Sequence, residues 1–372
     1  KDTEAALTAK RMNEFVLGHR DVFGPSVACG RVALMWSQDT ANNYASSVTE
    51  SDFTQAKAAG FAYRGDHRAA LFSVFDMLAR GHIQFDIVDE ENIRRGKLSQ
   101  YDTLILPGVA CLADDVAEKI GKYVAEGGNV LGNFDVGCYN ADGSPAGTPK
   151  LAEVFGLRGV PKIHKSDSIG SCYLFRTQED PLLTDLSFPR IPAPMLNVQW
   201  EATEDTEILM EARVPMPSTY ANLPDERYPG ITKHPYGKGM AYYISGNYAE
   251  TVVNERNILD YGRLLRCFCS VTSRPVVESD APGLYEVVLR RQENRFLLHI
   301  INMTGAMARS IDRTVPLHDV PFRLDLSGFG IDKEIRTITP VCGGQLKDVC
   351  MEGNRVNFTL DKLDTWQIVV IE

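Results

Sequence analysis

The sequence lacks the features of two large classes of protein, those that span membranes and those that bind nucleic acids. No apolar run approaches the ~20 residues that a helix needs to cross a bilayer. Basic residues are not in excess either, since 39 Lys and Arg stand against 49 Asp and Glu, a net charge of -10 at pH 7. Nucleic-acid binding depends on clustered Lys and Arg. We therefore expect no nucleic-acid partner and no membrane partner.

Spacings typical of metal sites and of disulfide frameworks are missing as well. The eight cysteines are scattered, and none of the seven histidines has a second His or Cys at metal-ligand spacing. We therefore expect no metal and no other cofactor. The cysteines are typical of reduced thiols in a core, which favours a cytoplasmic protein, although Cys342 and Cys350 could meet across a hairpin.

The length of the chain indicates two domains. At 372 residues, with 44% hydrophobic and 24% charged residues, it is a globular protein too long for one ordinary core. We predict one domain at 26–273 and a second at 274–372, because the apolar period changes from helical to two near Thr272–Pro275. Residues 1–25, which begin with Lys1 instead of Met, are predicted to be a helix and a linker from a preceding, missing domain.

The first predicted domain is organised around Tyr101–Asp135, which has the pattern strand, helix, strand. Leu104–Leu106 is a short apolar run, as a strand covered on both faces requires. Ala113–Glu126 has the apolar spacing of a helix, and a right-handed crossover would make the following strand parallel to the first. Ligands of such sheets bind beyond the carboxyl ends of the strands, here near Phe134 and Asp135.

Further elements alternate on either side of this stretch. Those predicted upstream are a strand at Arg31–Trp36, a long polar loop at Ser37–Asp66, a helix at His67–Arg80 and a strand at Phe85–Val88. Those predicted downstream are an antiparallel extension within 171–235, a strand at Met240–Ser245 and a closing helix at Asn254–Val271. This order predicts an α/β domain with a doubly wound parallel sheet.

Residues 274–372 have the two-residue period of antiparallel strands. Every second residue is apolar in the segments 285–290, 322–326 and 356–361, and turn residues separate these segments. Short strands at this spacing predict a small antiparallel β-sandwich.

In this order the elements resemble the β-galactosidase trimerisation domain, a glutamine-amidotransferase-like module that follows the catalytic barrel in certain glycoside hydrolases. The residues that carry the resemblance are Arg31–Trp36, His67–Val88, Tyr101–Asp135 and Tyr236–Gly246. The sandwich is similar to the C-terminal domain of the same enzymes through Asn302, Pro316–Val320 and Asp364–Val370. The resemblance implies a flavodoxin-like, class I glutamine-amidotransferase-like sheet and a homo-oligomer, most simply a trimer. It also implies a carbohydrate substrate and a catalytic barrel that this sequence does not contain.

The same resemblance implies that this region lacks amidotransferase chemistry. Such a fold would place a cysteine nucleophile on the sharp turn after Asn129–Asn133, where this sequence has Phe134. A histidine would follow the last parallel strand, where this sequence has Asn247 and Tyr248. Cys111 has no adjacent histidine and is interpreted as a buried structural thiol.

Glycoside hydrolysis normally needs two carboxylates about 5–9 Å apart. Asp39, Asp66 and Asp135 could share the crevice at the strand ends, and they are the candidate catalytic residues of a self-sufficient glycosidase. The plainer interpretation, which we favour, is that Asp39 and Asp66 cap turns or helices. In the resembling enzymes the acid and the nucleophile lie on the barrel.

Other side chains near the strand ends suit a sugar or a subunit contact, because aromatic faces stack on sugars and Tyr, Trp and Arg are enriched in interfaces. These substrate-binding or interface candidates are Trp36, Tyr44, Arg64, His67, Phe134, Tyr139, Asn247 and Tyr248. Three hypotheses follow: a non-catalytic region that assembles subunits and walls the active site of a glycoside hydrolase, a self-sufficient glycosidase, and a carbohydrate-binding module. We favour the first, because the positions expected for a nucleophile and a base hold neither.

Overall fold

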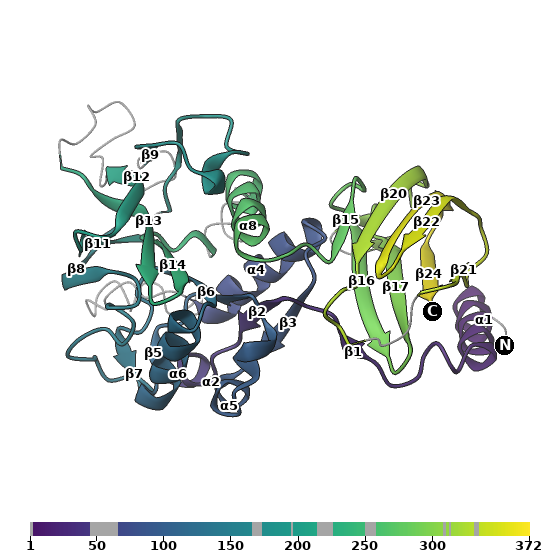
Figure 1. The fold of residues 1–372 in the computed structure, drawn as a ribbon, viewed down its shortest axis with the longest axis horizontal. Coiled ribbons are helices and arrows are strands. Elements are labelled where there is room, and N and C mark those ends of the chain that lie inside the picture. The colour runs from purple at the N-terminus through teal and green to yellow at the C-terminus, as the bar shows by residue number, and fades with distance from the viewer. Residues whose placement is uncertain are drawn as a thin grey trace. The chain divides into compact units, whose positions relative to one another are not determined.

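The computed structural model describes residues 3–44, 66–165, 173–194, 196–213, 226–249, 258–307, 310–311, 314–330 and 335–372. The chain divides into two compact units (Figure 1). The first is Gly30–Arg274, and the second combines Lys1–Cys29 with Pro275–Glu372. The segment 1–25 thus belongs to the same unit as the C-terminal strands.

A nine-stranded sheet forms the centre of the 30–274 unit. Its strands in sequence order are β2 (Val32–Met35), β3 (Phe85–Val88), β4 (Thr103–Leu106), β6 (Asn129–Asn133), β9 (Tyr173–Arg176), β10 (Arg190–Pro192), β12 (Glu207–Arg213), β13 (Tyr228–Tyr236) and β14 (Gly239–Ile244). Their order across the sheet is β10-β9-β12-β13-β14-β6-β4-β2-β3. The pairs from β14 to β3 are parallel, and those from β10 to β14 are antiparallel. The sheet is therefore mixed, with an antiparallel extension where the sequence predicts one.

Helices cover both faces of the parallel strands. They are α4 (His67–Arg80), α5 (Glu90–Arg94), α6 (Asp114–Ala125) and α8 (Ile258–Thr272). Successive residues of a strand point to opposite faces. Leu34, Ile105 and Leu131 accordingly share a buried cluster with α4 and α8, whereas Met35 and Leu104 share another with α5 and α6. This double covering explains why the apolar run at β4 is continuous instead of alternating.

Side-chain caps determine where the shorter helices begin. The hydroxyl of Ser37 accepts the Thr40 N–H at 3.0 Å and starts α2 (Gln38–Asn43), and Asp89 caps α5 in the same way. The predicted continuous loop from residue 37 to 66 is therefore wrong at α2. Both helices have fewer than two turns, too few to show a helical apolar period. Residues 45–65 of that predicted loop, Arg64 among them, and the predicted helix start at Asn254 lie outside the described residues.

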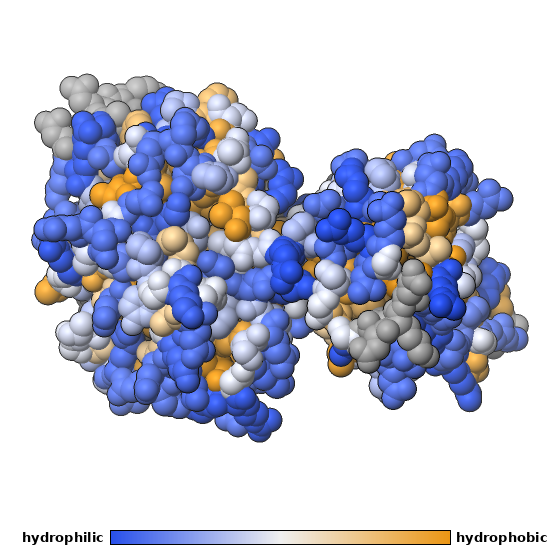
Figure 2. Space-filling model, viewed as in Figure 1, coloured by the Kyte–Doolittle hydropathy of each residue, from blue (hydrophilic) through white to orange (hydrophobic). Residues whose placement is uncertain are grey.

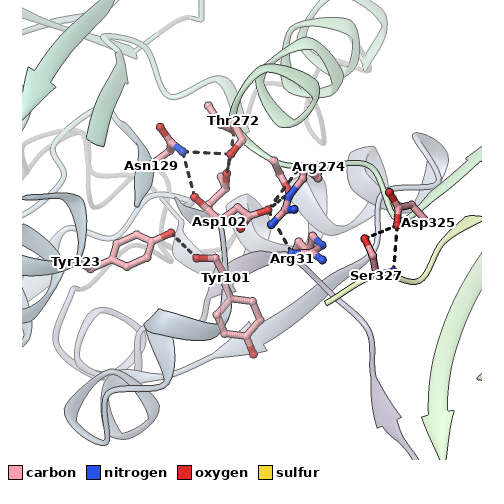
Figure 3. A network of polar contacts seen from close by, with 11 residues as sticks. Arg31, Tyr101, Asp102, Tyr123, Asn129, Thr272, Arg274, Asp325 and Ser327 are labelled. Carbon is pink, nitrogen blue, oxygen red and sulfur yellow. Dashed lines mark hydrogen bonds and ion pairs between the residues drawn. The ribbon is translucent and has the colours of Figure 1, made fainter. Parts of the chain in front are cut away.

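A polar network closes the amino ends of the parallel strands, around Asp102 (Figure 3). The Asp102 carbonyl oxygen accepts the Asn129 side-chain amide at 3.2 Å, and that amide also donates to the Thr272 carbonyl at 3.1 Å. The Asp102 carboxylate accepts the Arg274 N–H at 3.3 Å and lies 3.8 Å from the Arg31 guanidinium. The network ties the end of α8 to the sheet, and it leaves the opposite, carboxyl edge of the strands as the place for a site.

The remaining elements of the 30–274 unit are short or lie beside the main sheet. Two ribbons pair β5 (Cys111–Leu112) with β7 (Tyr139–Asn140) and β8 (Leu157–Lys165) with β11 (Leu196–Ala202). Two 3-10 helices are η1 (Lys97–Gln100) and η2 (Pro181–Leu183).

The second unit is built from two antiparallel sheets with a shared apolar core. One sheet contains β1 (Val27–Ala28), β16 (Tyr285–Gln292), β17 (Arg295–Asn302), β24 (Trp366–Ile371) and β21 (Ile338–Pro340). The other contains β15 (Val277–Ser279), β20 (Leu317–Asp325), β23 (Arg355–Leu363) and β22 (Leu346–Glu352), and a small pair joins β18 (Ala306–Met307) to β19 (Ser310–Ile311). The alternating residues Val287, Phe322 and Phe358 meet in the core, as a sandwich requires. Helix α1 (Glu4–Gly18) belongs to this unit, with the Phe15 ring 5.8 Å from the Trp366 ring.

The described surface and thiols agree with an ordinary globular chain. In the described part of the chain, no helix is long and apolar enough to cross a membrane. The visible face is mostly hydrophilic with separate small hydrophobic patches (Figure 2). All seven described cysteines are free, so Cys342 and Cys350 form no disulfide.

Candidate functional site at the carboxyl edge of the parallel strands

The turn after β6, where the resemblance would place a nucleophile, holds a phenylalanine in a left-handed conformation. Phe134 has a φ of 54°, a left-handed conformation that is rare for a bulky residue, and its side chain is only 1% exposed. Its N–H donates to the Ile244 carbonyl at 2.9 Å. Its carbonyl accepts the Tyr243 hydroxyl, which in turn accepts the Trp200 indole N–H at 2.8 Å. Neighbouring strands therefore hold the backbone in a strained turn whose side chain packs inward.

A buried acidic and aromatic cluster follows this turn. Asp135 is 3% exposed, and its carboxylate accepts the hydroxyl of the buried Tyr44. The rings of Tyr44 and Tyr139 meet edge to face, with centroids 5.3 Å apart. Burial, and then the charge of Asp135, raises the pKa of the Cys138 thiol, so this thiol stays protonated near neutral pH. The structure thus brings together three predicted site residues without creating a nucleophile.

His67 and Trp36 also meet, and both imidazole nitrogens of His67 have structural partners. The Ser37 N–H donates to Nε2 at 2.9 Å, so Nδ1 carries the proton and donates to the Pro107 carbonyl at 2.9 Å. Burial lowers the pKa of His67, which keeps the ring neutral. The Trp36 ring lies half-buried at 5.0 Å from the imidazole. With both nitrogens occupied, His67 orders the β2 end and is not placed to act as a base.

The buried Glu90 at the start of α5 was not among the residues singled out from the sequence. Its carboxylate accepts the Ser37 hydroxyl at 2.8 Å and the Gln38 and Asp39 N–H groups at 3.2 and 3.3 Å. Glu90 is 5% exposed, although its sequence context of consecutive acidic residues is typical of a solvated helix start. No sequence signal would have identified it.

The other two candidate aspartates, Asp39 and Asp66, lie at the starts of helices. Asp39 is in the first turn of α2, and partial burial followed by the charge of Glu90 raises its pKa. Asp66 caps α4, with its carboxylate accepting the Ala69 N–H at 3.1 Å. Asp66 is therefore a helix cap, whereas the cap of α2 is Ser37 and Asp39 lies inside the first turn of that helix.

The position expected for a histidine after β14 contains two buried side chains. Asn247 is 3% exposed, and its N–H donates to the Leu196 carbonyl at 2.9 Å. Tyr248 is 1% exposed and stacks on Tyr261 with ring centroids 5.5 Å apart. Tyr248 is one of the residues that line a small apolar cavity, and its hydroxyl has no hydrogen-bond partner among the residues that the structure describes. Burial raises its pKa, so it remains a neutral phenol.

Most of the candidate side chains at this edge of the sheet are buried. Of the described sugar or interface candidates, only Trp36 and Tyr139 keep partly exposed side chains. Among the described residues, no cluster of three or more His, Cys, Asp and Glu side chains could hold a metal ion. The buried side chains of this edge hold the backbone in place through packing and hydrogen bonds. The rings of Trp36 and Tyr139 are partly exposed and can contact a ligand or a neighbouring molecule.

Comparison with known proteins finds a family match for part of the chain and a shared fold in several solved structures. The family described as "Beta-galactosidase trimerisation domain" matches residues 30–168. Among solved structures, the α-L-fucosidase isoenzyme 2 from Paenibacillus thiaminolyticus is 19% identical with a TM-score of 0.67, and the match covers 96% of this chain and 50% of that one. The β-galactosidase from Rahnella sp. R3 is 15% identical with a TM-score of 0.64, over 99% and 44% of the two chains. The β-galactosidase from Bacillus circulans sp. alkalophilus is 16% identical with a TM-score of 0.58, over 93% and 42%. No curated protein matches the chain.

These structural likenesses show the shared fold, and the chain spans about half the length of the structures that it matches. The family match independently covers β2 to β8, the part that contains the Phe134 turn. The resemblance predicted from the order of the motifs is confirmed, because residues 30–168 match the family model of the β-galactosidase trimerisation domain.

Proposed function

We propose that this chain is a non-catalytic oligomerisation and active-site-walling region of a glycoside hydrolase that acts on carbohydrate. The observation that carries the proposal is the match of residues 30–168 to a trimerisation domain. The chemistry of the strand ends supports it, because the strained turn after β6 bears Phe134 and the position after β14 bears Asn247. A side chain without a nucleophilic atom cannot begin a covalent reaction.

We further infer that the 30–274 unit is a flavodoxin-like, class I glutamine-amidotransferase-like domain. The strand order β3-β2-β4-β6-β14, its parallel pairing and the helices on both faces support this assignment. The left-handed residue directly after β6 supports it as well. In this view the residues of this chain do not form the catalytic barrel of the parent enzyme.

The walling role falls on the two candidates that are partly exposed, Trp36 and Tyr139, together with Arg64, which lies outside the described residues. Half-buried aromatic rings on a rigid edge suit contact with either a sugar or a neighbouring barrel. The buried candidates would support this edge from within.

Sedimentation velocity of the chain, alone and with a catalytic barrel joined at its amino end, tests the proposal. We expect a closed oligomer, most simply a trimer, and no hydrolysis of chromogenic galactosides or fucosides by the chain without the barrel. A barrel-containing protein that stays monomeric at all concentrations would refute the assembly role.

The same preparations separate the two alternative hypotheses. A self-sufficient glycosidase predicts turnover by the chain alone that is lost in Asp135→Asn. A carbohydrate-binding module predicts heat of binding to galactosides or fucosides without turnover, weakened in Trp36→Ala. The buried, hydrogen-bonded state of Asp135 favours neither activity, so we expect both measurements to be negative for the chain alone.

A further inference from the structure

The outer face of the antiparallel extension displays arginines stacked on aromatic rings. In the paired strands β10, β9 and β12, Ile191, Leu174 and Ala212 are neighbours and point into the core. Strand alternation therefore turns the next residues outward. The outward residues of these strands include Glu211 and Pro192, and we call four others the arginine–aromatic face: Tyr173, Phe175, Arg190 and Arg213.

Each arginine of this face lies over a ring of the neighbouring strand. The guanidinium carbon of Arg190 is 5.0 Å from the centre of the Tyr173 ring, and that of Arg213 is 4.9 Å from the centre of the Phe175 ring. The two rings lie edge to face with centroids 6.2 Å apart. Cation–π stacking of this kind holds a guanidinium flat and limits the entropy that it loses on binding.

The donor groups of these arginines are not used within the described part of the chain. Neither Arg190 nor Arg213 has an ion pair among the described residues, whereas Arg227 nearby pairs with Glu211 at 3.4 Å. The Arg213 Nε group is buried and has no hydrogen-bond partner.

The geometry selects carboxylates in preference to sugars as that ligand. A sugar would need the open faces of the rings, but guanidinium groups already lie over Tyr173 and Phe175. A guanidinium that stacks by its face keeps the N–H donors of its edge free, and these match the two oxygens of a carboxylate. Phe188, two residues before Arg190 in the chain, is 68% exposed and offers an apolar side chain near this face in sequence.

The acidic net charge of the chain favours a second copy of the chain as the molecule that supplies the carboxylates. With 49 acidic and 39 basic residues, each copy presents an excess of carboxylates to its neighbours. Two arginine–aromatic faces would repel each other, so this face cannot pair with itself around a two-fold axis. It suits a heterologous contact, in which one surface meets a different surface of the next copy, and such contacts close into rings such as trimers.

We propose that the arginine–aromatic face is one half of the contact between copies of this chain and that it binds carboxylates of the neighbouring copy. This inference rests on the proposed assembly function and assigns a surface to it. Rim charges of this kind contribute to partner orientation and make association depend on ionic strength.

The test is the oligomeric state of the full chain, in the form that self-associates, after charge reversal of Arg190 and Arg213. We expect the double variant to glutamate to raise the dissociation constant by about a hundredfold or more in sedimentation velocity. The double variant to lysine keeps the charge but loses the planar fork, and it should give a smaller increase. Arg323→Glu is the matched control, because Arg323 is exposed on β20 in the other unit, and it should leave association unchanged.

Two measurements separate a failed contact from a failed fold or a failed function. The exposed Arg190 is reversed alone, and thermal unfolding is followed by circular dichroism, since Arg213 is partly buried and its reversal can destabilise the unit. The wild-type oligomer should also dissociate as salt is raised. If the wild type is an oligomer and both Arg190→Glu and the folded double variant remain so, this inference is wrong and the assembly function stands. If the wild type never associates, the assembly function itself fails.

Discussion

The left-handed turn at Phe134 can be tested with two substitutions. In regular structure a glycine variant is less stable than the alanine variant, and at Phe134 we expect the opposite order. Phe134→Ala removes a side chain that is 1% exposed, which should lower the free energy of unfolding by about 3–5 kcal/mol. Phe134→Gly removes slightly more volume, but it relieves the strain of a φ of 54°, which costs a residue with a Cβ about 1–2 kcal/mol. The additional chain entropy of glycine costs about 0.5–1 kcal/mol. We therefore expect the glycine variant to be more stable than the alanine variant, by up to about 1.5 kcal/mol.

Urea unfolding followed by tryptophan fluorescence measures this difference. In a Trp366→Phe background the remaining tryptophans, Trp36 and Trp200, both report on the 30–274 unit. Ala241→Gly in β14 is the matched control, because Ala241 is 1% exposed in a regular strand and should lose about 1 kcal/mol. If Phe134→Gly is less stable than Phe134→Ala by a similar amount, the turn stores no strain and the elbow geometry argued for this site is wrong.

Three further predictions concern the strand ends. Burial lowers the pKa of His67 below its unfolded value of 6.5, so the contribution of this side chain to stability is complete above that pH and is lost as the pH falls. In His67→Gln the urea midpoint should therefore decline less between neutral and acidic pH than in the wild type. Tyr44→Phe removes one hydrogen-bond donor to the buried Asp135 carboxylate and should cost about 1–3 kcal/mol, and in a double-mutant cycle the variant that also carries Asp135→Asn should lose less stability than the sum of the two single changes. Ser37→Ala removes both a helix cap and a donor to Glu90, so its thermal midpoint should fall by more than that of Asp89→Ala, which removes the cap of α5 alone.

The parts of the fold that depend on repeated local patterns were predictable from the sequence. The apolar run Leu104–Leu106 and the helix after it were recognisable because both faces of the strand and one face of the helix are buried. The alternation at 285–290 and 356–361 likewise predicted paired strands. Helix α2 escaped prediction because six residues held by the Ser37 cap carry no periodic signal.

The side-chain environments of the site were much less predictable. Position after a strand indicates that a residue lies at the carboxyl edge, but it does not indicate whether the side chain turns outward or into the core. Tyr248 and Phe134 lie at the predicted edge, yet both are 1% exposed because α8 and the β8–β11 ribbon supply neighbours from distant sequence. Glu90 is the converse, a charged residue that is buried because three donors around Ser37 satisfy its carboxylate.

The hydrogen bonds of its backbone explain why Phe134 stays in a strained turn that carries no nucleophile. The Phe134 N–H and carbonyl bind the Ile244 carbonyl and the Tyr243 hydroxyl of the adjacent strand, so relaxing the turn would leave buried polar groups unpaired at about 1–3 kcal/mol each. That penalty equals or exceeds the about 1–2 kcal/mol that the left-handed conformation costs. The turn can therefore persist for packing alone, and its geometry by itself is no sign of catalysis. The Phe134 ring lies in the same buried cluster as Leu157 and Val198 of the β8–β11 ribbon, so the close packing of this cluster holds the turn in place.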